Sequence, residues 1–115
     1  MRPLSHPKIE DITVEGILYA LADPVRARIF MELAGAESAK NCSTFLGACG
    51  GGASLPKSTL SQHFKVLREA GLVYSERKGV EMHNSTRCAE LREKYGALVG
   101  GIVAGYAAQW GKSLG

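Results

Sequence analysis

Apolar residues recur at helical spacing in the first third of the chain, and this pattern predicts two helices, over residues 9–22 and 24–33. Asp23 suits an N-cap and Pro24 suits the first helical position, so the second helix begins there. Gly35 is positioned to end it. The predicted inward positions are Ile9, Ile12, Ile17, Leu18 and Leu21 in the first helix, and Val25, Ile29, Phe30 and Leu33 in the second.

Residues 36–56 have a weaker pattern. A short helix is predicted over 40–47, where Phe45 and Leu46 are apolar. Glycines 50–52 end it, because three consecutive glycines do not form a stable helix interior. No Gly-Lys-Ser/Thr follows, so the glycines do not form a Walker phosphate loop. They are interpreted as a flexible turn.

The pattern predicts an amphipathic helix from 56 or 57 to 70. Leu60, Phe64 and Leu67 are spaced by four and three residues and share one face. Gly71 suits the position after the helix. Strands are predicted over 72–75 and 80–85, joined by a basic turn at 77–79. The polar face of the helix carries Ser58, Gln62, Lys65 and Glu69, with Thr59 and Ser61 at its flanks.

A long helix is predicted over 88–110, with an apolar stripe along its length. It also contains two Gly-x-x-x-Gly pairs, and each glycine costs a helix about 1 kcal/mol. Small residues at this spacing let two backbones approach closely, which favours a second subunit over packing against the first helix. The predicted dimer interface consists of Leu91, Tyr95, Leu98, Gly101, Ile102, Gly105 and Tyr106.

The composition is that of a globular protein: 115 residues, 45% hydrophobic and 22% charged. We expect an irregular arm at 1–8 and a single domain at 9–115. The net charge is +3, with a local excess of Lys and Arg between 57 and 78 where an anionic partner could bind. No secretory signal is present, and the uncharged run 95–111 is too short and Gly-rich to span a membrane. A cytoplasmic location with reduced cysteines follows, and no membrane partner is expected.

Two segments of this chain resemble the ArsR/SmtB family of bacterial regulators. LADPVRARI at 21–29 is similar to the opening motif of the family, and STLSQHFKVLREAGLV at 58–73 is similar to its recognition-helix motif. The resemblance spans about residues 15–110. It implies a mainly α winged helix-turn-helix fold with a small β-hairpin. It also implies a homodimer, joined through the terminal helices, that represses transcription at operator DNA until an effector releases it.

The resemblance places the DNA-binding residues on the recognition helix and the wing. Gln62 can bond an adenine edge with two hydrogen bonds, while lysines suit phosphates. His63 lies nearer the inner face, where helix packing is the alternative interpretation. Arg26 lies in the opening motif, although a structural salt bridge explains it equally well. The predicted DNA-binding residues are Lys57, Ser58, Thr59, Ser61, Gln62, His63, Lys65, Arg77 and Lys78.

The effector is not identified by the sequence. The metal-sensing members of the family carry a Cys-x-Cys pattern or carboxylate and histidine pairs in the terminal helix, and this chain has neither. No metal site is assigned and no cofactor is expected. Cys42, Cys49 and Cys88 could bind a trivalent arsenical or Zn²⁺, or act in redox sensing. Cys42 and Cys49 lie about 10 Å apart if helical, too far for a disulfide. The alternatives are buried structural cysteines and a hydrophobic ligand at the dimer interface.

Other classes of function remain as alternatives. A winged helix can bind protein instead of DNA, and a MarR-type regulator binding an organic ligand has a related fold but normally a longer chain. An enzyme is not expected, because no nucleophile motif or carboxylate pair is present. The three histidines, His6, His63 and His83, fall on separate predicted elements.

Overall fold

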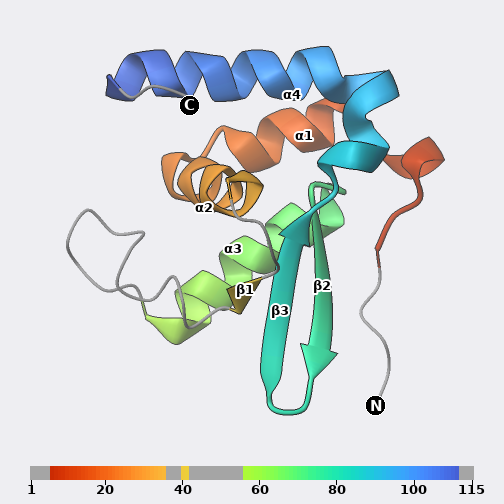
Figure 1. The fold of residues 1–115 in the computed structure, drawn as a ribbon, viewed down its shortest axis with the longest axis vertical. Helices are drawn as coiled ribbons and strands as arrows, with labels where there is room; N and C mark the ends of the chain where they lie inside the picture. Colours follow the sequence, from red (N-terminus) through yellow and green to blue (C-terminus); the bar gives the residue numbers. More distant parts are fainter. Residues whose placement is uncertain (1–5, 36–39, 42–55, 112–115) are drawn as a thin grey trace.

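A computed structural model describes residues 6–35, 40–41 and 56–111. Within them α4 lies across α1 and α2, α3 lies beyond α2, and a β-hairpin projects from the far side (Figure 1). The fold is therefore mainly helical with a hairpin wing. The elements are η1 (Ile9–Asp11), α1 (Val14–Leu21), α2 (Pro24–Ala34), β1 (Lys40–Asn41), α3 (Lys57–Glu69), β2 (Val73–Lys78), β3 (Glu81–Thr86) and α4 (Cys88–Trp110).

The predicted helix over 9–22 is wrong in its first third. A single 3-10 turn is followed by extended backbone at Ile12, and α1 begins only at Val14. Thr13 is the N-cap, and its hydroxyl accepts a hydrogen bond of 3.0 Å from the Gly16 N–H. The Ile12 carbonyl instead accepts a 2.6 Å hydrogen bond from the Tyr95 hydroxyl. The break therefore joins the N-terminal segment to α4.

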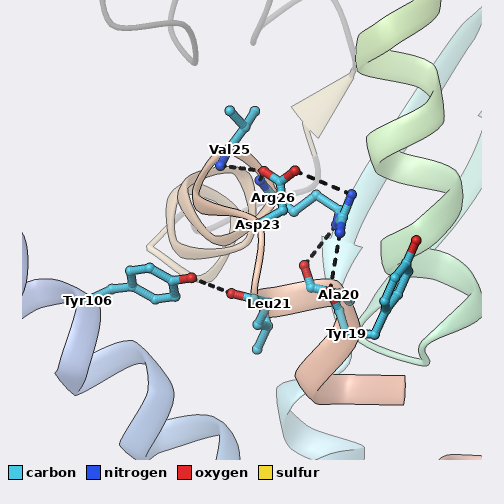
Figure 2. Close-up of polar contacts among 7 residues, drawn as sticks. All are labelled: Tyr19, Ala20, Leu21, Asp23, Val25, Arg26 and Tyr106. Atoms are coloured by element: carbon cyan, nitrogen blue, oxygen red, sulfur yellow. Dashed lines mark hydrogen bonds and ion pairs between the residues drawn. The ribbon is translucent and has the colours of Figure 1, made fainter. Parts of the chain in front are cut away.

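The corner between α1 and α2 is held by polar side chains (Figure 2). Asp23 caps α2 as predicted, accepting from the Val25 N–H at 2.8 Å and the Arg26 N–H at 3.3 Å. Arg26 reaches back to α1, donating to the Ala20 carbonyl at 2.8 Å and the Tyr19 carbonyl at 3.2 Å. It also lies 3.6 Å from an Asp23 carboxylate oxygen. Arg26 thus satisfies carbonyls at the end of α1 that the helix leaves unbonded.

The end of α3 determines where the chain turns into the hairpin. Leu72 N–H bonds to the Leu67 carbonyl and Gly71 N–H bonds to the Arg68 carbonyl, the two bonds of a Schellman motif. Gly71 has φ +85°, as its predicted place after the helix requires. A Cβ there would lie 2.4 Å from Ile12 Cδ1. Glycine is therefore required both by the backbone conformation and by the close approach of Ile12.

The sheet has three strands in the order β1-β3-β2, all antiparallel. The predicted helix over 40–47 is wrong at Lys40 and Asn41, which pair with Asn84 and His83 of β3. Residues 42–47 lie outside the described residues. β2 is longer than the predicted strand over 72–75, because it continues through Lys78, whereas β3 is shifted by one residue from the predicted 80–85. Gly79 with φ +64° forms the turn. Cross-strand pairing from Val73↔Thr86 to Lys78↔Glu81 explains the length of β2, since Arg77 and Lys78 are paired residues.

One core lies between α1, α2, α3 and α4, and Ile17, Phe30, Phe64 and Leu91 are among its buried side chains. α4 has the predicted limits and contributes Leu91, Val99 and Ala107 as buried residues. No helix among the described residues is long and apolar enough to cross a membrane.

Candidate nucleic-acid interface

The outer face of α3 is exposed and polar. Helical geometry places Ser58, Gln62 and Lys65 on one strip, directly opposite the buried Leu60 and Leu67. The N-cap residue of this helix is Pro56, which makes no side-chain capping hydrogen bond. The predicted contact residues that are exposed on α3 are Lys57, Ser58, Thr59, Ser61, Gln62 and Lys65.

His63 differs from the other predicted α3 residues. It is half-buried, and its Nδ1 is buried with no hydrogen-bond partner among the described residues. The inward position agrees with its place on the helix. Burying a ring nitrogen without a hydrogen bond is unfavourable.

The wing carries the two predicted basic residues. Arg77 and Lys78 are exposed on β2, and Lys78 Nζ lies 3.5 Å from a Glu76 carboxylate oxygen. An exposed pair of this kind is worth little, so it does not immobilise Lys78. At the tip, the Val80 side chain is 97% exposed. The wing tip therefore presents one apolar side chain beside two cations.

A crevice of about 450 Å³ separates α3 from the wing. Three cations line it, Lys57 and Arg68 from α3 and Arg77 from β2, against one carboxylate, Glu81. The arrangement gives a positive channel of the kind that attracts a phosphate backbone. The complete lining is Lys57, Ser61, Phe64, Arg68, Arg77, Val80, Glu81 and Met82.

Arg68 was not among the predicted site residues. The spacing of Lys57, Ser61, Phe64 and Arg68 by four, three and four residues was the available signal, because it places all four on the side of α3 that faces the wing. Arg68 Nη1 also lies 3.5 Å from the Ser75 hydroxyl, which itself donates a 2.6 Å hydrogen bond to Asn84 Oδ1. Ser75 and Asn84 are both buried, so a polar pair anchors the hairpin next to α3.

The predicted dimer residues on α4 differ in how far they are exposed. Leu91 is 1% exposed within the chain, and the Tyr95 and Tyr106 hydroxyls bond to main-chain carbonyls of Ile12 and Leu21. These three side chains are already used inside the protomer. Gly101 and Gly105 are exposed, and a Cβ at either would meet no atom within 4 Å. Leu98 and Ile102 are half-buried.

Of the three candidate sensor residues, Cys88 is the first residue of α4 and is half-buried against the core. Cys42 and Cys49 lie outside the described residues. No group of three or more His, Cys, Asp or Glu side chains gathers around a possible metal position in the described parts of the chain.

Comparison with known proteins agrees with this architecture. A family model described as a helix-turn-helix domain matches residues 21–76. No curated protein matches the chain. Among solved structures, M. tuberculosis Rv0081 is 30% identical, with a TM-score of 0.59, covering 83% of this chain and 88% of its own.

Two further structures are similar. NolR from Sinorhizobium fredii is 27% identical, with a TM-score of 0.62, over 98% of this chain and 100% of its own. An ArsR-like transcriptional regulator from Rhodococcus sp. RHA1 is 23% identical, with a TM-score of 0.59, over 85% of this chain and 84% of its own. At that identity the Rhodococcus protein supports the fold alone.

An exposed polar helix, a basic crevice and a hairpin beside it define a winged helix-turn-helix DNA-binding protein. The chain belongs to the ArsR family of transcriptional regulators, a family of DNA-binding proteins without enzymatic activity.

Proposed function

We propose that this chain is a homodimeric repressor. Its α3 helix contacts the bases of operator DNA, its wing contacts the phosphate backbone, and an effector releases it from the DNA. The observation that carries the proposal is the exposed row of Ser58, Gln62 and Lys65 beside the crevice lined by Lys57 and Arg77. Amide and hydroxyl groups suit base edges, and cations suit phosphates.

Dimerisation is supported by two exposed surfaces. Gly101 and Gly105 leave one side of α4 open to a second backbone. On α1 the apolar side chains of Val14, Leu18 and Tyr19 are 45%, 47% and 67% exposed. The dimer we propose joins α4 to its symmetry mate through the glycine side, with Leu98 and Ile102 at the margin. A homodimer has two recognition helices, one for each half-site of an operator.

The test is fluorescence anisotropy with a duplex from the chain's own promoter region, measured in reductant over a salt series. A steep fall in affinity with salt supports DNA binding through the phosphate backbone. Salt-independent binding, or none, contradicts the proposal and favours a protein-interaction module. A duplex of scrambled sequence is the control for specificity.

The effector is tested on the same complex by mild oxidation and, separately, by added arsenite. Loss of binding on treatment assigns sensing to Cys42, Cys49 and Cys88, and single Cys→Ser variants then identify which thiols matter. Binding unaffected by either treatment contradicts a thiol sensor and directs the search to organic ligands at the dimer interface.

A further inference from the structure

The segment from His6 to Ile12 joins the base of the wing to α4. The Ser75 backbone N–H donates a 3.0 Å hydrogen bond to His6 Nε2. The imidazole stacks on the Tyr74 ring with centroids 4.5 Å apart and 24° between the planes. One residue on, the Pro7 carbonyl accepts a 2.8 Å hydrogen bond from Arg87 Nη1. In Figure 1 this segment lies to the right of the upper end of the hairpin.

The His6 contact replaces a missing strand. β2 is at one edge of the sheet, because the order is β1-β3-β2. Ser75 is 2% exposed, so its N–H must find a partner inside the protein. The imidazole supplies the acceptor that a neighbouring strand would otherwise provide. The bond therefore fixes the hairpin where it leaves the body of the protein.

We propose that His6 positions the wing for DNA, and that protonation of its imidazole releases the wing. Accepting the Ser75 N–H requires the Nε2 lone pair, which exists only in the neutral ring with its hydrogen on Nδ1. A protonated ring carries hydrogens on both nitrogens, so an N–H would face an N–H. The inference rests on the DNA-binding role proposed above.

The surroundings offer the protonated ring a second position. Arg87 bonds both Glu90 carboxylate oxygens, at 2.9 Å and 3.2 Å. This hydrogen bonding lowers the pKa of Glu90, with burial opposing it, so Glu90 is ionised wherever a histidine titrates. Glu90 lines the same hollow as His6 and attracts an imidazolium. Among the described residues, the titratable and charged groups that line this hollow with His6 are Tyr74 on β2, Arg87 just before α4, Glu90 on α4, and Lys8 and Glu10 on its own segment.

Ser75 connects this contact to the DNA-facing surface. Its hydroxyl donates to Asn84 of β3, and Arg68 of α3 lies within 3.5 Å of the same oxygen. Arg77, which forms one wall of the crevice, is two residues further along β2. Loss of the hydrogen bond between His6 and Ser75 therefore changes the distance between Arg77 on β2 and Lys57 on α3, which line opposite sides of the crevice. Weaker binding to the duplex follows.

The first experiment compares duplex affinity between pH 8 and pH 5.5 for the wild type and His6→Gln. Glutamine can accept the Ser75 N–H through Oε1 but does not titrate. We expect acidification to weaken the wild type by about two- to tenfold relative to His6→Gln, the range for one lost hydrogen bond. His6→Ala should bind at pH 8 as the wild type does at pH 5.5. Identical pH profiles for wild type and His6→Gln overturn the proposal.

His83→Gln is the matched control, since His83 is also on the wing but its ring lies 3.4 Å from a Glu81 carboxylate oxygen. It should keep the wild-type loss of affinity at low pH. If His83→Gln removes that loss and His6→Gln does not, the proposal is overturned.

A second measurement needs no DNA. In ¹H–¹⁵N spectra of the full chain, the Ser75 amide should shift with the titration of the His6 ring in the wild type and stay constant in His6→Gln. An amide that does not follow His6 overturns the proposal even where DNA binds. An amide that follows His6 in a chain that binds no duplex at any pH upholds the contact, but overturns the proposed function and with it the effect on DNA.

Discussion

The hydroxyl of Tyr106 in α4 donates a 2.5 Å hydrogen bond to the carbonyl oxygen of Leu21, the last residue of α1. Arg26 satisfies the two preceding carbonyls, of Tyr19 and Ala20 (Figure 2). The C-terminal end of α1 thus receives its donors from α2 and α4, and three helices meet at one point. Tyr106 is also stacked on Trp110 at 4.8 Å, which fixes its ring.

Tyr106→Phe should lower the free energy of unfolding by about 1 kcal/mol, because the ring stays in place while a carbonyl loses its donor. Urea unfolding at fixed protein concentration measures this. Tyr19→Phe is the control, since that ring is 67% exposed and no hydrogen bond of its hydroxyl is described. Equal stability of the two variants would contradict the structural importance of the bond.

Gly71→Ala should destabilise the fold by about 2–4 kcal/mol, from left-handed backbone strain and the contact with Ile12 together. Gly79→Ala shares a positive φ but has nothing within 4 Å, so it should cost about 1 kcal/mol. Thermal unfolding measures the loss of stability in both variants. The difference between the two losses gives the contribution of the contact between a Cβ at position 71 and Ile12. A Gly79 variant as unstable as the Gly71 variant would argue against it.

Gln62→Ala should weaken operator binding by about 1–3 kcal/mol, with the loss concentrated at one base pair. Lys65→Ala should instead weaken binding to all sequences and reduce the salt slope by about 1. Anisotropy titrations against the operator and single-base variants separate these effects. If Gln62→Ala retains full affinity, Gln62 does not read a base.

Gly101→Leu should disrupt the homodimer, because a large side chain would keep the two α4 backbones apart. Gly101→Ala is the control for the change in helix propensity, because it also removes a glycine but its single methyl group still permits close approach of two backbones. Sedimentation velocity measures both. A dimer that survives Gly101→Leu would place the interface elsewhere.

Glu90→Gln should lower stability at neutral pH by about 1 kcal/mol or less, as the side chain is 53% exposed. The pKa of Glu90 is lowered in the folded state, so its contribution is present above the unfolded value near 4.5 and is lost as pH falls through the folded value. Wild type and variant should therefore converge in stability as the pH falls through the lowered pKa of Glu90. A difference that persists in acid would assign the effect to something other than this carboxylate.

The sequence was sufficient where local signals agree. Asp23 and Pro24 mark the start of α2, Gly71 marks the end of α3, and the stripe from Leu91 to Trp110 marks α4. For α2 and α3 the apolar period and the flanking residue favour the same limits, and for α4 the period alone is long enough to define them.

Local signals failed where distant contacts decide. Ile12 follows Ile9 at helical spacing, yet its backbone is extended. Its contacts are with Gly71 and Tyr95, which are far along the chain. Lys40 and Asn41 form a strand because β3 pairs with them. The spacing within α3 places Arg68 on the same side as Lys57 and Ser61, but it does not reveal that the wing packs opposite that side to form the crevice. The DNA contacts, the dimer and the effector stay predictions.

The bond between His6 and Ser75 also bears on how the chain is handled in the laboratory. An uncovered edge strand offers its backbone groups to other chains and so promotes aggregation. A clone shortened to begin at Lys8 would leave the buried-edge N–H of Ser75 without its acceptor. Low solubility in such a clone would reflect loss of a protective covering, and tags are best placed ahead of an intact N-terminal segment.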